Sequence, residues 1–297
     1  MHHSKTLLLT FALLAGSIWL ANAQTARLAN LSSRAFCETR DAVLLDEFVI
    51  QGMGTETLVM RGLGPSLGGF GVPDALKDPT VFLFDARGRT LDANNDWMDN
   101  PDKDEIIAHG LAPTDPHESA IIDTLAPGLY TFVEQGVRRT QGVALPEIYD
   151  LLDGGLQLSA VGTRGFVSTG DNVMLGGFIL TGSESVSLLI RGLGPSLANA
   201  GLSRVLTDPN LELYDANGQL IFLDDNWKDT QEEEIIATGL PPTDDRESAM
   251  VVTLVPGAYT AVLSGIDSTT GIGFLQLYSL ELPIRELNPA PIIKGSH

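Results

Sequence analysis

Two acidic loops hold the oxygen-bearing side chains that could bind a metal ion. Residues 92–118 contain eight acidic residues and one lysine, and residues 222–247 contain nine acidic residues, one lysine and one arginine. Calcium takes about six to eight oxygen ligands from carboxylates, amides and carbonyls. We therefore expect a calcium site to draw on these residues: Asn95, Asp96, Asp115, Glu118, Asp224, Asp225, Asn226, Asp244, Asp245 and Glu247.

A second interpretation of the acidic loops stays open. Neither loop has the spacing of an EF-hand. Asp and Asn are also common turn and helix-cap residues, so the loops could simply be a hydrated acidic surface. The sequence does not show whether the two halves of each loop, 94–97 with 115–118 and 224–227 with 244–247, meet in space.

One tryptophan in each loop suggests a ligand-binding role. Trp97 and Trp227 each follow an Asp or Asn just after an expected strand. An exposed indole could stack on a sugar ring, which would make the pair a carbohydrate-binding site. The alternative is an indole packed between sheets, with its N–H bonded to a loop carbonyl.

An arginine at the end of an apolar strand is the next candidate. Arg61 and Arg191 each precede the letters GLGPS. This motif lacks the Gly-Lys-Ser/Thr ending of a phosphate-binding loop. We expect each guanidinium to bind a carboxylate, such as Asp78 or Asp208, or loop carbonyls, rather than an anionic ligand.

Residues for catalysis are sparse. His109 and His117 occur only in the first half, and Thr238 and Arg246 replace them in the second. The Gly-Pro-Ser-Leu letters do not form the G-x-S-x-G elbow of hydrolases. We therefore assign no catalytic residue and expect a protein that is not an enzyme.

Charge and cysteine content exclude several other functions. The 297-residue chain has 18 Lys and Arg against 38 Asp and Glu, a net charge of −20. So acidic a chain repels phosphate backbones, which argues against nucleic-acid binding. Its one cysteine, Cys37, cannot form an internal disulfide or a cysteine-based zinc site, and we expect it to be buried.

The sequence that must position these residues occurs as two similar copies. The letters RGLGPSL at 61–67 recur at 191–197, an offset of 130, and EIIA at 105–108 recurs at 234–237, an offset of 129. Each copy has the size of a domain. We therefore predict a first repeat at 28–153, a second at 156–282 and a flexible tail at 283–297.

Each repeat is expected to be all-β. Short β-branched and aromatic runs separated by Gly, Pro, Asn and Asp predict strands, and residues 231–239 predict a short helix ended by a glycine. The fold class is therefore two tandem antiparallel β-sandwich domains, jelly-roll-like, each with one short helix. The expected strands of the second repeat are 158–166, 172–180, 186–191, 210–214, 220–223, 249–254, 258–264 and 273–278.

The first residues predict a secretory signal peptide at 1–23. An apolar run of about 14 residues is followed by Ala21-Asn22-Ala23, which is typical of a cleavage site near Ala23. An uncleaved anchor is the alternative, although a membrane span needs roughly 20 apolar residues. No later stretch predicts a membrane span, so we expect a periplasmic or extracellular protein.

The residues that recur also resemble a known kind of module. The letters LLIRGLGPSL, DPNLELYDANG and EEEIIATGLPPTDDRESAMVVTLVPGAYTAVLSG resemble a secreted repeat module of bacterial surface proteins over 28–282. Residues 208–264 are loosely similar to the bacterial pre-peptidase C-terminal domain, which implies a calcium-assisted β-sandwich beside a secreted enzyme. In the first repeat, Pro146-Glu147 is expected to interrupt the last strand.

These observations predict a secreted, non-enzymatic repeat protein for cell-surface or matrix association or ligand binding, with Ca²⁺ as a structural cofactor. Polysaccharide or another cell-surface component is the expected partner. One alternative is a pair of carbohydrate-binding modules accessory to a separate enzyme. Another is a hydrolase whose site the sequence does not mark.

Overall fold

The computed structural model describes residues 27–151 and 157–287, so the expected signal peptide at 1–23 lies outside the described residues. About half of the described residues lie in β-strands, and nearly all strand pairs are antiparallel. The predicted all-β class is confirmed. No helix among the described residues is long and apolar enough to cross a membrane.

The strands of the two repeats correspond one to one. In the first repeat they are β1 Arg27–Cys37, β2 Leu44–Gln51, β3 Glu56–Leu63, β4 Pro79–Asp85, β5 Thr90–Asn94, β6 Ser119–Leu125, β7 Gly128–Gly136 and β8 Gly142–Asp150. In the second they are β9 Gln157–Val167, β10 Met174–Thr181, β11 Val186–Leu193, β12 Pro209–Asp215, β13 Leu220–Asp224, β14 Ser248–Leu254, β15 Gly257–Gly265 and β16 Gly271–Ser279.

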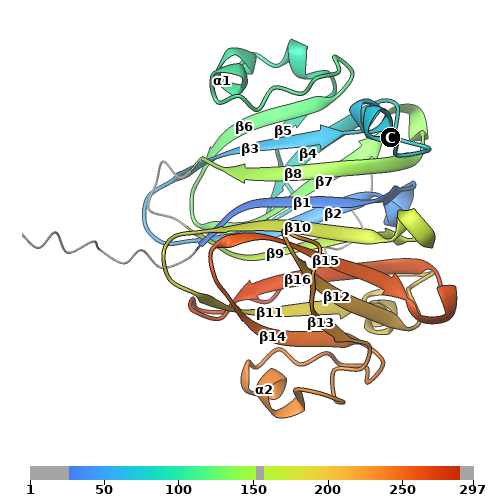
Figure 1. Ribbon diagram of the computed structural model, residues 1–297. Coiled ribbons are helices and arrows are strands. Elements are labelled where there is room, and N and C mark those ends of the chain that lie inside the picture. Colours follow the sequence, from blue (N-terminus) through green and yellow to red (C-terminus); the bar gives the residue numbers. More distant parts are fainter. Residues whose placement is uncertain (1–26, 152–156, 288–297) are drawn as a thin grey trace, which may run out of the picture.

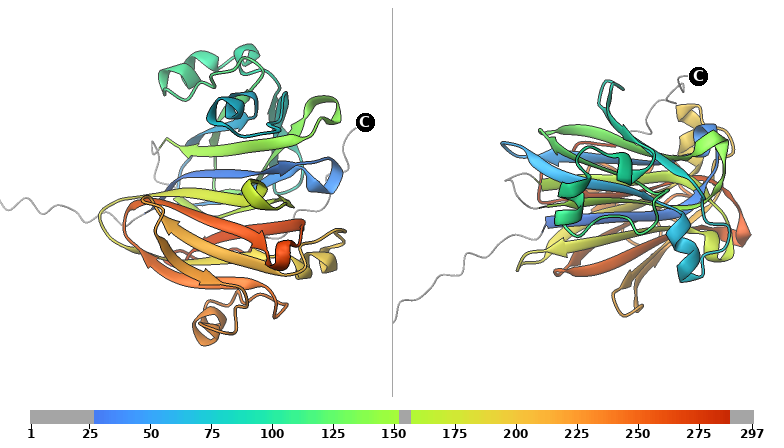
Figure 2. Two further views of the ribbon diagram at one scale, coloured as in Figure 1. Left: turned by 45° about the vertical axis from the view of Figure 1, so that its right-hand side comes forward. Right: turned by 90° about the horizontal axis from the view of Figure 1, so that it is seen from above.

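The helices are all short. Each repeat has one α-helix, α1 Lys103–Ala108 or α2 Glu232–Ala237, and these helices lie at opposite ends of the molecule (Figures 1 and 2). The 3₁₀ turns are η1 Arg40–Ala42, η2 Pro65–Phe70, η3 Trp97–Asp99, η4 Val137–Arg139, η5 Gly170–Asn172, η6 Pro195–Ala200 and η7 Ile266–Ser268.

The elements predicted for the second repeat are confirmed to within a few residues at each end. All eight strands are present, and α2 lies where the short helix was expected. Gly239 follows it with a φ of +78°, a left-handed conformation that favours glycine and ends the helix.

The strands form two long sheets that both run through the two repeats (Figure 1). Sheet 1 has the order β6-β3-β8-β1-β10-β15-β12-β13, and sheet 2 has the order β5-β4-β7-β2-β9-β16-β11-β14. The two orders are the same when the repeats are exchanged. The molecule therefore has an approximate twofold relation between its halves.

The first strand of each repeat joins the repeats together. β1 pairs with β8 of its own repeat and with β10 of the other, and β9 pairs in the same way with β16 and β2. β1 and β9 also meet each other at Leu28 and Leu158 and at Phe36 and Phe166. Two separate sandwich domains at 28–153 and 156–282 are therefore not confirmed, because the hydrogen-bonded sheets continue across the boundary.

The hydrophobic core is likewise shared. One cluster of buried side chains contains residues from both repeats, including Phe48 and Phe178. Phe48 stacks on Tyr130 and Phe178 stacks on Tyr259, each with ring centroids 5.5 Å apart. The equal geometry of these pairs shows that the two halves pack their interiors in the same way.

The interruption expected at Pro146 is absent, because β8 runs through this residue. Toward β1, the pairing passes from Ser32 and Glu147 directly to Ala35 and Ala144. Proline has no N–H to donate, and it lies where the ladder has this gap. The strand thus accommodates Pro146 by losing pairing on one side only.

Candidate functional site

Two of the expected calcium ligands are structural. Glu118 and Glu247 are fully buried. Glu118 Oε1 accepts hydrogen bonds from the N–H of Gly64 at 3.1 Å, from the N–H of Ser66 at 3.0 Å and from its hydroxyl at 2.5 Å. Glu247 does the same for Gly194 and Ser196 at 2.6–3.0 Å. Each carboxylate therefore fixes the GLGPS turn of its own repeat.

The two halves of each acidic loop do meet, but through other groups. The backbone N–H of Trp97 donates to Glu118 O at 2.8 Å, and that of Trp227 donates to Glu247 O at 2.9 Å. Within residues 27–151 and 157–287, no three His, Cys, Asp or Glu side chains are grouped as a metal site requires. The expected calcium site therefore lacks converging carboxylates.

Most of the remaining acidic-loop residues have protein partners. They make turns or ion pairs within their own loop, which is the behaviour expected of a hydrated acidic surface. In the first loop, Asp115 accepts a hydrogen bond from the His117 N–H, and Asn95 donates one to Asp96. In the second loop, Asp224 accepts from the Ala249 N–H and from Thr230, and the Asn226 carbonyl accepts from the Asp229 N–H. Asp244 forms an ion pair with Arg246, Asp245 forms one with Lys228, and Asp225 is partly buried.

The tryptophans are packing residues rather than an exposed pair. Trp227 is only 5% exposed, and Trp97 is partly buried against the cluster around Ile106. Their indole N–H groups donate to the carbonyls of Asp115 and Asp244, at 3.1 and 3.2 Å. Trp227 therefore has no free face for a sugar ring, and the assignment of both tryptophans to ligand binding is not supported.

Arg61 and Arg191 anchor loops, as expected, but their partners differ from those proposed. Arg61 donates to Glu147 at 2.8 Å and to the Leu111 carbonyl at 2.9 Å. Arg191 donates to Gln276 at 3.0 Å and to the Leu240 carbonyl at 2.9 Å. Asp78 and Asp208 are not among these partners, because the adjacent strand, β8 or β16, brings its own polar residue nearer.

A tyrosine completes each arginine cluster. The Tyr149 ring lies 5.0 Å from the Arg61 guanidinium carbon, and the Tyr278 ring lies 5.1 Å from that of Arg191. Burial and the neighbouring Glu147 raise the pKa of Tyr149 to about 12, so its hydroxyl keeps its proton at neutral pH. The cluster in the first repeat is thus an internally neutralised ion pair.

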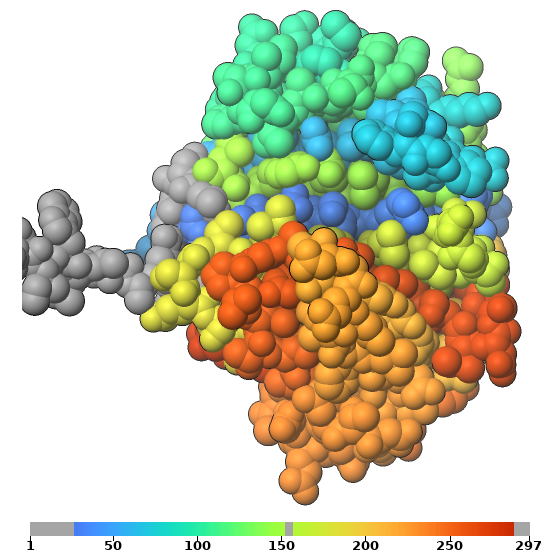
Figure 3. Space-filling view, viewed as in Figure 1, coloured from blue at the N-terminus to red at the C-terminus, as the bar shows by residue number. Residues whose placement is uncertain are grey.

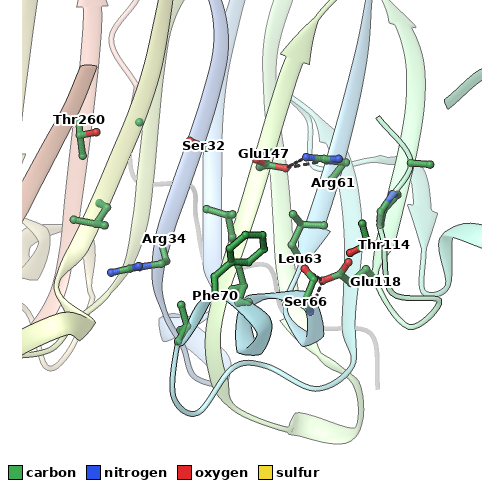
Figure 4. A pocket seen from close by; sticks show the side chains of 17 residues that line it. Ser32, Arg34, Arg61, Leu63, Ser66, Phe70, Thr114, Glu118, Glu147 and Thr260 are labelled. Carbon is green, nitrogen blue, oxygen red and sulfur yellow. Dashed lines mark hydrogen bonds and ion pairs between the residues drawn. The ribbon is translucent and has the colours of Figure 1, made fainter. Parts of the chain in front are cut away.

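A hollow lies on the outer face of sheet 1, beside this arginine cluster. It has a volume of about 530 Å³, and we call it the junction pocket. Its side chains come from both repeats, as Figure 4 shows: Arg61 and Glu147 lie on one side, and Arg34 and Thr260 lie on the other. Figure 3 shows that η2 projects over this face.

Small residues on adjacent strands explain the hollow. Ser32 of β1 faces Gly177 of β10 across the ladder, so neither contributes a bulky side chain to the floor. Leucines at 63, 145 and 175 form apolar walls. Phe70, at the end of η2, is 85% exposed and lines the pocket. An exposed aromatic beside an apolar hollow is typical of a binding surface.

The pocket also offers hydrogen-bond donors. Arg34 uses one guanidinium nitrogen to donate to the Asp171 carbonyl at 2.9 Å. Its other N–H groups, and the hydroxyls of Ser32, Thr114 and Thr260, make no hydrogen bond within the part of the chain that the structure describes. Neither His109 nor His117 is among the lining residues. The site therefore combines apolar contact with donors for a carboxylate or a carbonyl.

The corresponding face of sheet 2 is covered by the chain itself. Residues 280–287 leave β16 and return over β9, and Leu287 is only 1% exposed. A Cβ atom on Gly162, which corresponds to Ser32, would lie 3.0 Å from Leu287. In the described part of the tail expected to be flexible at 283–297, the Pro283 carbonyl accepts from Gln51 at 2.7 Å and Leu287 is buried against the sheet. We call this covered region the closed face.

The interior of the first repeat differs from that of the second as well. Asp46 and Glu134 are fully buried, where the second repeat has Gly176 and Leu263. Burial raises the pKa of Asp46 to about 7, although Thr163 donates a hydrogen bond to it at 2.6 Å. Burial, and secondarily Asp46, raises the pKa of Glu134 well above its usual range.

The predicted burial of Cys37 is confirmed. It is fully buried in the shared core, and burial, with a contribution from Glu134, raises the pKa of its thiol to about 12. A thiol that does not ionise near neutral pH is a poor nucleophile. Cys37 therefore belongs to the packing of the core and not to a reactive site.

Comparison with known proteins assigns no family. No protein-family model matches the chain, and no curated protein matches it. Among solved structures, an oxalate decarboxylase of Bacillus subtilis is similar at 7% identity, over 86% of this chain and 73% of that one, with a TM-score of 0.17. So low a score carries no argument about fold or activity. The resemblance to secreted repeat modules therefore has no support from these comparisons.

Proposed function

We propose that the chain is a secreted, non-enzymatic binding protein and that the junction pocket is its ligand site. The observation that carries this proposal is the contrast between two corresponding faces. Residues 280–287 cover the closed face, whereas the junction pocket is open and lined by unused donors. The N-terminal run and the Ala21-Asn22-Ala23 letters support secretion.

The lining supports binding rather than catalysis. The two carboxylates of the pocket, Glu118 and Glu147, are already engaged by backbone N–H groups and by Arg61. A general acid or base needs a proton-transfer group directed at the substrate. The remaining polar groups, a guanidinium and hydroxyls, suit recognition. The strand orders support a description of each repeat as a jelly-roll-like unit joined to the other through β1 and β9.

An apolar anion is the simplest probe of this proposal. We expect one molecule of anilinonaphthalene sulfonate to bind per chain, with its rings on the leucine walls and its sulfonate near Arg34. The Leu145→Phe variant should reduce this binding at least about tenfold, because Phe274 at the corresponding position helps to fill the closed face. Fluorescence titration gives both the stoichiometry and the dissociation constant.

The matched control adds the same ring elsewhere. Ile236 on α2 is 51% exposed, so Ile236→Phe enlarges an apolar side chain far from the pocket. This variant should bind the probe as the unmodified protein does. Absence of saturable binding, or equal binding by both variants, would show that the junction pocket is not the site.

A further inference from the structure

The closed face shows what this type of surface accepts. Leu287 lies over Gly162, its N–H donates to the Tyr278 hydroxyl at 3.1 Å, and its carbonyl accepts from Gln276 at 3.3 Å. The carboxylate of Glu286 lies 3.5 Å from Arg191. An acidic residue followed by leucine, in irregular chain without strand or helix, is therefore bound through its side chains and through its backbone.

The first repeat keeps the same framework, and no described residues occupy it as 286–287 occupy the closed face. Tyr149 and Arg61 correspond to Tyr278 and Arg191, and Ser32 provides a small floor as Gly162 does. Chain connectivity accounts for this difference between the described parts of the two repeats. After β8, the Leu151 N–H donates to the Thr57 carbonyl. After β16, the Leu280 N–H donates in the same way to the Ser187 carbonyl. In the first repeat, however, the chain enters β9 at Gln157. Only five residues, 152–156, separate Leu151 from β9, whereas the covering segment of the closed face has eight, 280–287.

Resting on the proposed function, we propose that the junction pocket binds an extended segment of a partner protein that presents an acidic residue beside a leucine-like residue. The aliphatic side chain lies on the floor made by Ser32 and Gly177 and against Phe70. The carboxylate pairs with Arg34, because Arg61 is neutralised by Glu147. A segment N–H donates to Glu147, which replaces the Gln276 of the closed face.

The occupant is a separate protein rather than a second copy of this chain. In each copy, the acidic-leucine segment that fits is already bound to its own closed face. An intramolecular segment has an effective concentration in the millimolar range, so it resists exchange with another chain. The junction pocket is therefore left for a segment from elsewhere.

A synthetic peptide with the sequence of residues 283–287 and a fluorescent label is the probe, because Glu286-Leu287 is its only acidic–leucine pair. Fluorescence anisotropy should show saturable binding to the full chain, and the peptide carrying L287S should bind at least about tenfold more weakly. Gly177→Glu and Leu145→Phe should each weaken binding by about tenfold or more, whereas Ile236→Phe should not. Arg34→Gln should weaken it severalfold and reduce its dependence on salt.

Four results would overturn this inference. Equal binding of both peptides would remove the requirement for leucine. Equal binding by Leu145→Phe and the unmodified chain would place the peptide elsewhere, and unchanged melting temperatures keep that comparison valid. Self-association that Gly177→Glu abolishes would make a second copy the occupant. If the sulfonate probe binds and the peptide does not, the proposed function stands and this inference fails.

Discussion

The two repeats share one fold and one arginine–tyrosine cluster, yet one outer face is covered and the other is hollow. On sheet 2, Phe274 and Leu287 fill the space over β9. On sheet 1, the positions that correspond to Phe274 and Gly162 are Leu145 and Ser32, and no segment within residues 27–151 and 157–287 lies over them. The comparison shows that a duplicated framework acquires different surfaces when chain connectivity supplies a covering segment to only one copy.

The two repeats also differ in the polar residues of their interiors. The first repeat buries Asp46 and Glu134, which the second replaces by Gly176 and Leu263. Buried carboxyl groups reduce stability at neutral pH unless they stay protonated or paired. The interior of the first repeat therefore carries two buried carboxyl groups at positions where the second repeat has apolar or small residues.

Removal of the covering leucine tests the comparison most directly. We expect Leu287→Ala to lower the free energy of unfolding by about 2–3 kcal/mol, because a buried leucine side chain is lost. It should also allow a second molecule of anilinonaphthalene sulfonate to bind. Urea denaturation measures the first effect, and Ile284→Ala, at a side chain that is 40% exposed, is the control. Equal losses in both variants would show that Leu287 does not hold the closed face.

The buried carboxyl of Asp46 predicts a pH-dependent effect of comparable size. Its pKa is about 7 in the folded chain and 3.8 in the unfolded chain, so between these values only the unfolded chain releases the proton. The free energy of unfolding therefore falls as the pH rises from about 4 to 7 and then levels off. Asp46→Asn should be more stable than the unmodified chain at pH 8, by at most about 4 kcal/mol, with the gain vanishing near pH 4.

A surface carboxyl provides the control for this pH profile. Hydrogen bonds from the backbone and side chain of Arg89 lower the pKa of Asp85, so Asp85→Asn should give no gain at pH 8. Thermal melting across the pH range measures both variants. A gain for Asp46→Asn that is the same at pH 4 and pH 8 would contradict a proton retained in the folded state.

The smallest expected effect concerns calcium, for which the two repeats should behave alike. Since the acidic loops of the described chain do not bring three carboxylates together, millimolar Ca²⁺ should leave the melting temperature unchanged relative to EDTA. A rise that Asp96→Ala and Asp225→Ala each reduce would instead assign calcium to both loops, as the composition of the loops suggested.

Local rules were enough to predict much of the fold. Short β-branched and aromatic runs bounded by Gly, Pro, Asn and Asp located the eight strands of the second repeat, and the EEEIIATG letters located α2 with its terminal Gly239. Buried glutamates such as Glu118 were missed as structural residues. Glu118 is structural because its carboxylate accepts hydrogen bonds from three donors of one turn. These contacts form only in the folded chain, and the residues around Glu118 in the sequence do not distinguish it from surface acids such as Asp96.

The sequence by itself determined the duplication, the all-β class and the burial of Cys37, because these depend on local patterning and composition. Only the tertiary structure decided which surface is open. The junction pocket needs β1 to pair with β10 of the other repeat, which brings Ser32 and Gly177 side by side although they are far apart in the chain. Because β2 and β10 are corresponding strands with similar residues, the sequence pattern of either repeat does not reveal which of them β1 pairs with.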